Sequence, residues 1–459
     1  MTAIMESKPT RGASGEVRAA TTHFLASVGV GTLGGLLFGF DTAVIAGTTH
    51  DLATVFNLSP GMLGITVSIA LLGTIFGSLC AGTPGQKLGS RAVLRYMALL
   101  YLFSALGCAF AWSWPALLCW RFVGGVGIGG SSVLGPVYIA EIAPARQRGR
   151  FVGLFQFSIV SGVLLAYLSN YLVQRWIHSF QEWRWEFGVA SVPALLFFIL
   201  LFRVSESPRW LLSQGRAQQA RNVLKRMGSS NPGAAASIET SLSAVDQSHQ
   251  TPLFQRKYML PILLAISVGI FNQLSGINAI LYYLNDIFRS GGFGAASSSL
   301  QAIIVGALNL LATALALTVI DVIGRRPLLL LGAAGMAFSL SAAASIMFGR
   351  LNHRYLLLCL AAYTFCFAFS QGAVIWVYLS EIFPTAVRAK GQSLGASVHW
   401  LANATISGLF PVIAARSAGY PFALFAVMMA VQFVVVYFFY PETKRLSLEQ
   451  LEEKLGVER

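Results

Sequence analysis

Long apolar stretches, each about the length needed to cross a membrane, follow one another along almost the whole chain. A helix that spans a bilayer needs about 20 mostly apolar residues. Twelve stretches meet this requirement, at roughly 24–47, 60–82, 92–111, 114–139, 150–174, 185–203, 257–284, 299–320, 327–349, 354–380, 389–413 and 420–440. The pattern predicts an all-α membrane protein with twelve transmembrane helices.

The longest polar interruption, residues 204–256, divides these stretches into two sets of six. Residues 207–228 carry apolar positions at helical spacing with basic residues between them, which is typical of short helices at a membrane surface. The sequence therefore predicts five parts, which are an N-terminal tail (1–23), a six-helix half (24–203), a helical linker (204–256), a second six-helix half (257–440) and a C-terminal tail (441–459).

Composition supports a membrane protein and excludes a soluble globular enzyme. Of the 459 residues 55% are hydrophobic and only 11% are charged, whereas a soluble domain carries about 25% charged residues. The net charge of +14 does not indicate nucleic acid binding, because the basic residues are not clustered on one polar domain. The five cysteines fall in apolar stretches without metal-ligand spacing, so we expect no metal and no cofactor.

Lysine and arginine are distributed unevenly between the two sides of the predicted membrane. The tails, the linker and the loops after even-numbered helices hold 24 of the 32 basic residues, and the opposite loops hold 6. Because an excess of Lys and Arg marks the cytoplasmic side, we expect both termini and the linker to be cytoplasmic. Residues 1–22 lack the apolar core of a signal peptide. We expect a multi-pass protein of the cell (inner or plasma) membrane.

Three short motifs occur once in each half. Residues 141–148 read E-I-A-P-A-R-Q-R and residues 381–388 read E-I-F-P-T-A-V-R, which is an offset of 240. A Gly-containing basic loop repeats at an offset of 235, and a Glu after the sixth span of each half repeats at 236. These offsets indicate a duplicated half, and paired membrane halves related by an axis along the membrane normal are known from one large class of transporters.

The charged residues of these motifs all lie at the predicted cytoplasmic helix ends. We interpret them as ion pairs that hold the two halves together when the inner side is closed and that break when the halves rock apart. The alternative is topogenic charge and solvation of helix ends, but the duplicated spacing favours a gate. The predicted cytoplasmic gate comprises Arg91, Glu141, Arg148, Glu206, Asp321, Arg325, Arg326, Glu381, Arg388 and Glu442.

Asp41 and Arg121 lie inside predicted spans, one in the first and one in the fourth. Ionisable residues are costly within a membrane, so they indicate function by default, and each is the obvious partner of the other. A conformational change that alters the balance between desolvation and the neighbouring charge would make Asp41 a proton carrier. The alternative is a permanent buried ion pair. The glycines that follow Arg121 are typical of close helix packing.

Uncharged polar and aromatic residues mark several other spans. Asn272, Ser275, Asn278 and Tyr282 are spaced so that they would share one face of a continuous helix. Amides offer both donors and acceptors to hydroxyl groups, and Trp can cover the apolar face of a sugar. These residues favour a neutral, polyhydroxylated ligand. The alternative is hydrogen bonding between helices. We interpret Ser275, Tyr283 and Trp400 as packing residues.

These motifs together resemble the sugar porter family of the major facilitator superfamily over essentially the whole chain. The matching segments are 34–41, Arg121 with its glycines, 141–148, 206–210, 272–283, 321–326, 381–388 and 441–444. The resemblance implies the major facilitator fold, alternating access, a proton site at Asp41 and Arg121, and a monosaccharide held mostly by the C-terminal half. By matching motif, the sugar contacts would be Phe38, Gln156, Asn272, Gln273, Asn278, Tyr282, Asn309, Trp376, His399 and Asn403.

Departures from the family pattern sharpen these expectations. Facilitators of the family tend to have an uncharged residue at position 41, so Asp41 favours proton symport. Apolar Val163 favours a hexose and leaves a pentose open. Gln86 and Ser90 stand where the first-half loop usually has an acidic and a basic residue, so the gate in that half is expected to be weaker.

The sequence therefore predicts a monosaccharide–proton symporter that works as a monomer in the lipid bilayer. The alternatives are a proton-independent facilitator and, more remotely, a sugar-sensing receptor, which would be expected to have a longer cytoplasmic tail than the roughly nineteen residues after the last span. No pair of nucleophile and base is visible at membrane depth, so we expect no catalytic residues and no enzyme.

Overall fold

Helices account for nearly all of the chain that the computed structural model describes, which comprises residues 11–143, 148–177, 181–227, 252–384, 387–444 and 450. Twelve helical segments are long and apolar enough to cross a membrane, which confirms the predicted number of spans. The helices are α1 (Arg11–Val55), α2 (Pro60–Leu88), α3 (Ser90–Ala109), α4 (Trp114–Ile142), α5 (Arg148–Trp176), α6 (Glu182–Val189), α7 (Ser191–Leu200), α8 (Pro208–Ser213), α9 (Ala217–Arg226), α11 (Met259–Leu274), α12 (Ile277–Tyr282), α13 (Leu284–Ser290), α14 (Ala295–Ile323), α15 (Arg325–Met347), α16 (Leu356–Phe369), α17 (Gln371–Glu381), α18 (Arg388–Arg416) and α19 (Tyr420–Phe439).

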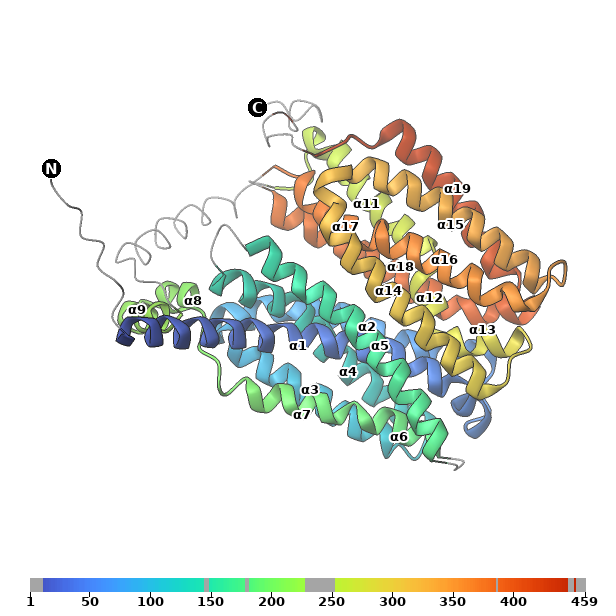
Figure 1. Cartoon of the computed structure of the whole chain (residues 1–459), viewed down its shortest axis with the longest axis horizontal. Coiled ribbons are helices and arrows are strands. Elements are labelled where there is room, and N and C mark those ends of the chain that lie inside the picture. Colours follow the sequence, from blue (N-terminus) through green and yellow to red (C-terminus); the bar gives the residue numbers. More distant parts are fainter. Residues whose placement is uncertain are drawn as a thin grey trace.

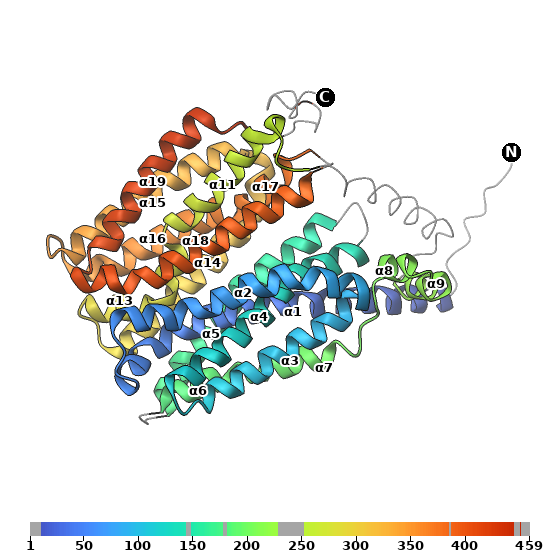
Figure 2. The ribbon, with the colours of Figure 1, turned by 180° about the vertical axis from the view of Figure 1, so that it is seen from behind.

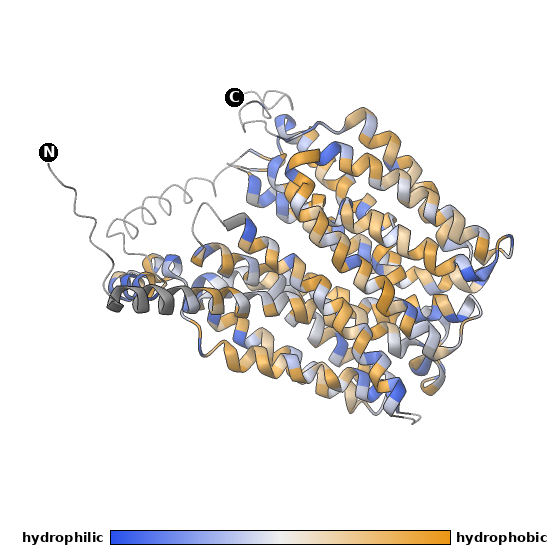
Figure 3. Cartoon of the chain, in the orientation of Figure 1, coloured by the Kyte–Doolittle hydropathy of each residue, from blue (hydrophilic) through white to orange (hydrophobic). Residues whose placement is uncertain are grey.

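The helices form two bundles, α1 to α7 and α11 to α19, and the start of α1 and the end of α19 lie at the same end of the molecule (Figures 1 and 2). We call this the terminal end and the opposite end, where α6 and α13 lie, the far end. The surface of the bundles is largely apolar along the helices, and polar residues gather toward their ends (Figure 3). The short helices α8 and α9 fall in the predicted linker and lie at the terminal end; residues 228–251 of that linker lie outside the described residues.

The hydrophobic core shows where the two bundles meet. The terminal half of α1, from Phe24 to Leu37, packs in a core of residues from the N-terminal half and the linker. A separate core, which includes Val374 and Tyr378, consists of residues from the C-terminal half and Leu253 of the linker. From Phe40 onward α1 instead belongs to a core shared by both halves. The halves are therefore packed together at the far end and have separate cores toward the terminal end.

Glycines let α2 and α4 pack with their backbones almost in contact. A Cβ atom on Gly125 would lie 2.0 Å from the carbonyl oxygen of Ala70, and one on Gly73 would lie 2.3 Å from that of Phe122. Small residues at helix interfaces allow this approach in membranes. The close packing predicted for the glycines after Arg121 is confirmed, and it holds the helix that carries this arginine.

The seventh span is broken, and the prediction of one continuous polar face along it was wrong. The helix α11 ends at Leu274, Gly276 adopts a left-handed φ of 82°, and α12 begins at Ile277. A Cβ atom on Gly276 would lie 2.2 Å from the ring of Phe425, so packing against α19 also requires glycine. The tenth span breaks as well, at Ser370 between α16 and α17.

Candidate functional site

Asp41 on α1 and Arg121 on α4 form an ion pair inside the membrane-spanning part of the N-terminal half. Nη1 of Arg121 lies 3.6 Å from Oδ1 of Asp41. The arginine side chain is only 4% exposed and lies over the ring of Phe187, whereas the aspartate is 21% exposed and lines a small pocket with Tyr101 and Ser104. The cation is thus more deeply buried than the carboxyl group, which borders a small pocket. A proton on Asp41 would leave Arg121 without its anion.

A connected cluster of amides surrounds the break in the seventh span. Nδ2 of Asn278 donates to Oε1 of Gln273 at 3.0 Å, and Nε2 of Gln273 donates to Oδ1 of Asn272 at 3.2 Å. The same Nε2 lies 3.1 Å from Nε2 of His399, which reaches the cluster from α18. The break brings the end of α11 and the start of α12 together, so the amide side chains on the two segments form hydrogen bonds with one another.

A second polar group joins α12 to α18. Nδ2 of Asn403 lies 3.4 Å from the hydroxyl oxygen of Tyr282, and Oγ of Ser407 donates to Oδ1 of Asn403 at 3.0 Å. Asn403 and Tyr282 are both buried. These residues are predicted sugar contacts, and the structure brings them together.

Aromatic residues lie beside the amide cluster. The rings of Trp376 and His399 are 5.2 Å apart, and those of Phe38 and Trp400 are 5.4 Å apart. The second contact crosses between the halves, because Phe38 is on α1. Trp376 is 38% exposed, so its ring is available to a ligand.

The last two predicted sugar contacts, Gln156 and Asn309, lie on α5 and α14, which pack against each other across the two halves. Among the hydrogen bonds of the described residues, neither joins the amide cluster. No group of three His, Cys, Asp or Glu residues in the described ranges could hold a metal ion.

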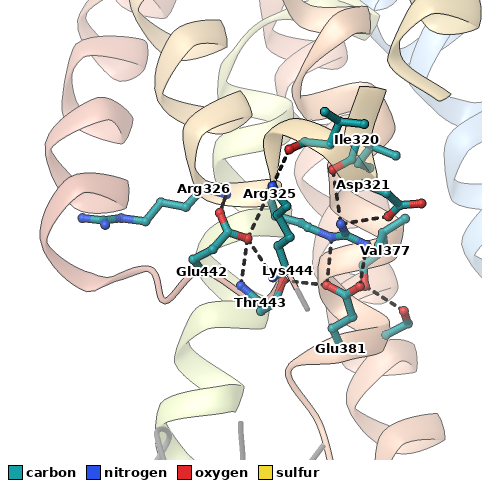
Figure 4. Close-up of polar contacts among 11 residues, drawn as sticks. Ile320, Asp321, Arg325, Arg326, Val377, Glu381, Glu442, Thr443 and Lys444 are labelled. Carbon is teal, nitrogen blue, oxygen red and sulfur yellow. Dashed lines mark hydrogen bonds and ion pairs between the residues drawn. The ribbon is translucent and has the colours of Figure 1, made fainter. Parts of the chain in front are cut away.

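At the terminal end, the C-terminal half carries a dense polar cluster (Figure 4). Arg325 binds Glu381 through Nε and Nη2, at 3.1 and 2.8 Å, and its Nη1 lies 3.0 Å from Asp321. The carboxylate of Glu442 accepts the backbone N–H groups of Arg325 and Arg326, both at 3.0 Å. Since these are the first residues of α15, Glu442 caps that helix.

The N-terminal half has a sparser version of this cluster. The backbone N–H of Arg91 donates to Oε1 of Glu206 at 3.1 Å, and its Nε lies 3.4 Å from Oε2. Nη1 of Arg91 donates to the carbonyl oxygen of Val204 at 2.7 Å. Oε2 of Glu141 is buried without a hydrogen-bond partner. The side chain of Arg148 lies outside the described residues.

In this conformation no named partner in either cluster comes from the opposite half. Arg388 likewise donates from Nε to the carbonyl oxygen of Phe383 at 3.2 Å. The gate predicted between the halves therefore stays a prediction for a conformation in which the terminal ends meet.

Sequence reasoning missed a polar network at the far end that crosses between the halves. Gln174 of α5 binds Glu186 of α6 and also Ser299 of α14. Glu186 falls within the predicted sixth span, so its place in an apolar stretch was the signal that could have found it. Asp286, between the seventh and eighth spans, belongs to the same region. Burial raises the pKa of its carboxyl group, and a hydrogen bond with Thr49 acts in the opposite direction.

Comparison with known proteins gives a consistent result. A family model described as "Sugar (and other) transporter" matches residues 28–455. The D-xylose-proton symporter of Escherichia coli is 37% identical over 92% of this chain and 94% of its own length. The glucose transport protein of Synechocystis is 36% identical over 92% of this chain and 96% of its own length. The xylose transporter of Escherichia coli in a partially occluded inward open conformation superposes with a TM-score of 0.84, at 34% identity over 93% of this chain and all of that one.

Proposed function

Because this chain belongs to the sugar transporter family and is a transporter, not an enzyme, we propose that it carries a monosaccharide together with protons by alternating access. The observation that carries the proposal is the Asp41–Arg121 pair, in which a packed arginine faces a carboxyl group that lines a pocket. Coupling then arises by linkage, since protonation of Asp41 shifts the equilibrium between inward-open and outward-open states. Relatives named as a proton symporter and as a glucose transport protein support this assignment.

A hexose is the proposed substrate, with a pentose as the second candidate. The amides of Gln273, Asn278 and Asn403 offer donors and acceptors to neutral hydroxyl groups, and Trp376 offers a ring face. The buried cation that the described residues place at this depth, Arg121, already faces Asp41, so a neutral sugar suits the site better than an anionic one. Apolar Val163 favours a hexose.

Residues 24–203 and 257–440 are proposed to move as the two units of the cycle, with the terminal end facing the cytoplasm of a cell membrane. The excess of basic residues at that end supports this orientation. Two C-terminal fusions test this orientation. A fused fluorescent protein that matures only in the cytoplasm should fluoresce, and a fused phosphatase that is active only in the periplasm should be inactive. The opposite pair of results would reverse the orientation.

The proposed function is tested by uptake of labelled D-glucose into proteoliposomes, with and without an inward proton gradient. We expect the gradient to drive accumulation by the wild type, whereas Asp41→Asn only equilibrates or exchanges sugar. Thr54→Val, a change further along α1 at a hydroxyl that donates to the backbone carbonyl of His50 in the same helix, serves as the control and should retain accumulation. If the wild type equilibrates glucose equally fast without a gradient and never concentrates it, the protein is a facilitator. If glucose does not move, the same assay with xylose, galactose and fructose tests the choice of sugar.

The amide cluster is tested by Asn278→Ala in the same assay. Losing one hydrogen bond that favours the sugar costs roughly 1.4 kcal/mol, which is about a tenfold weaker apparent affinity. Thr318→Val is the control, because the Thr318 hydroxyl donates to the backbone carbonyl of Leu315 within α14. Equal effects of the two changes would remove Asn278 from the sugar site.

A further inference from the structure

A chain of hydrogen bonds crosses from one half to the other at the far end. Asn285 of α13 donates from Nδ2 to Oγ of Ser299 at 3.3 Å, and Ser299 of α14 donates to Oε1 of Gln174 at 2.5 Å. Gln174 of α5 then donates from Nε2 to Oε1 of Glu186 at 3.0 Å. All four side chains lie in or beside the core that the two halves share, so the chain exists when the far end is closed.

Every donor in this chain points toward Glu186, so the chain ends on one oxygen of its carboxyl group. Glu186 is 1% exposed. Its other oxygen, Oε2, is buried without any hydrogen-bond partner. A buried acceptor without a donor is costly in free energy. Oε2 of Glu186 is therefore the unsatisfied acceptor of this network.

Gly47 of α1 leaves the space that Oε2 of Glu186 borders. A Cβ atom on Gly47 would lie 2.6 Å from Oε2 of Glu186 and 2.5 Å from Nδ2 of Asn170 on α5. Nδ2 of Asn170 donates to the carbonyl oxygen of Val44 at 3.1 Å, and no hydrogen bond joins it to Oε2 within the described part of the chain. The carboxyl group of Glu186 is therefore enclosed on this side as well, with one of its oxygens lacking a donor.

We propose that Glu186 is a second proton-binding site of the transporter and that it is protonated on Oε2 when the far end is closed. Oε1 still accepts from Gln174, and the proton on Oε2 removes the charge from a buried carboxyl group that has no donor on that side. Opening of the far end would separate Gln174 from Ser299, admit water to the carboxyl group and allow the proton to leave. The inference rests on the alternating-access cycle proposed above but does not depend on the role of Asp41.

The charges around Glu186 favour its neutral form. The groups that face it are Glu182 on its own helix, Asp51 of α1 and Arg289 of α13. Arg289 is also the neighbour of Asp51 and of Asp286, and His50 lies near both of these aspartates. Within the described part of this region, one arginine serves three buried or half-buried carboxyl groups. A proton on the most buried of them reduces the excess of negative charge.

Infrared difference spectroscopy of the purified full chain tests the proposal directly, because a protonated carboxyl group has a carbonyl band that a carboxylate lacks. The measurement uses the Asp41→Asn background, so that Asp41 contributes nothing, and compares it at neutral pH with the same protein carrying Glu186→Gln. We expect one carboxylic-acid band to be lost in Glu186→Gln and retained in the matched controls Glu182→Gln and Asp286→Asn. Superposable spectra of the background and Glu186→Gln would overturn the proposal.

A second variant keeps the test valid if Glu186→Gln does not fold. Gln174→Leu removes the donor to Oε1 and leaves the carboxyl group in place, so the carbonyl band of a protonated Glu186 should shift in frequency. An unshifted band would mean that the acid belongs to another residue. Because the band is read without transport, its presence is independent of whether Asp41→Asn abolishes accumulation, and the two proposals can fail separately.

Discussion

The two polar clusters at the terminal end share their backbone geometry and differ in their charges. In each half a glycine with positive φ, Gly89 at 90° and Gly324 at 103°, precedes a span. In each half a distant glutamate accepts the backbone N–H of the second residue of that span, since Glu206 accepts from Arg91 at 3.1 Å and Glu442 accepts from Arg326 at 3.0 Å. The capping arrangement was therefore retained in both copies of the duplication.

The charged part of the cluster was not retained in both copies. Arg325 occupies the first position of α15 and binds Glu381 with two hydrogen bonds. The first position of α3 is Ser90, and the corresponding glutamate, Glu141, has a buried oxygen without a partner. A helix cap and an ion-pair network are therefore separable devices. Among the described residues, the N-terminal half has the cap and one ion pair, Arg91 with Glu206, but no counterpart of the pairs that Arg325 makes with Asp321 and Glu381. The substitutions below test this view through the free energy of unfolding in detergent micelles.

Arg325→Met should have the largest effect. The arginine side chain is 9% exposed and binds two acidic side chains, so its removal leaves Glu381 partly buried without a cation. Breaking such a pair costs about 3 kcal/mol. The change for comparison in the other half is Arg91→Met, which removes the arginine of the ion pair with Glu206; its side chain is 27% exposed and the ion-pair distance is longer, at 3.4 Å. We expect about 1 kcal/mol there. Equal losses would contradict the asymmetry.

Gly89→Ala and Gly324→Ala should destabilise the protein by similar amounts. Both glycines have φ and ψ values that side-chain-bearing residues rarely adopt, which costs about 2 kcal/mol. A new Cβ would also lie 2.9 Å from the Glu206 carboxyl carbon or 2.7 Å from Oε2 of Glu442. The control is Gly188→Ala, a helical glycine whose Cβ would make an ordinary contact at 3.7 Å. A loss in only one half would show that the cap itself has diverged.

The two clusters also show which features could be predicted from the sequence. The repeated motifs located Glu381, Glu442 and Arg325 without a structure, because charged residues at fixed offsets leave a visible pattern. Whether the clusters join the halves depends on which of two conformations is populated, and these differ by only a few kcal/mol. The order of residue types along the chain does not reveal so small a difference in free energy between two conformations.

For the site inside the membrane, too, the sequence predicted some features and missed others. Apolar length predicted the spans, and isolated charges identified Asp41 and Arg121. The break at Gly276 was missed because it depends on packing against Phe425, which is far away in the sequence, and glycine alone is tolerated in membrane helices. The network at Glu186 was missed because its partners come from helices of both halves, which only the fold brings together.

Ser90→Arg tests whether an arginine at the first position of α3 restores the ion pair that the N-terminal half lacks among the described residues. If the first position of α3 reaches Glu141 as Arg325 reaches Glu381, the variant should gain about 1 kcal/mol from a charge-assisted hydrogen bond. Ser90 is 4% exposed, so part of the gain is offset by crowding. The same change in a Glu141→Gln background is the control and should give no gain. Stabilisation that persists there would have to come from a contact other than Glu141.

Asp321→Asn should have the smallest effect, although its carboxylate lies 3.0 Å from the same Arg325. The aspartate is 81% exposed, so water and salt screen the pair and its contribution is about 0.5 kcal/mol or less. The position that corresponds to it in the N-terminal half already holds an uncharged residue, Gln86. A small loss that disappears at high salt would mean that the bidentate pair with Glu381 carries the asymmetry between the halves. A loss as large as that of Arg325→Met would instead mean that the three residues act as one network, and that the N-terminal half lacks it because of Gln86 as well as Ser90.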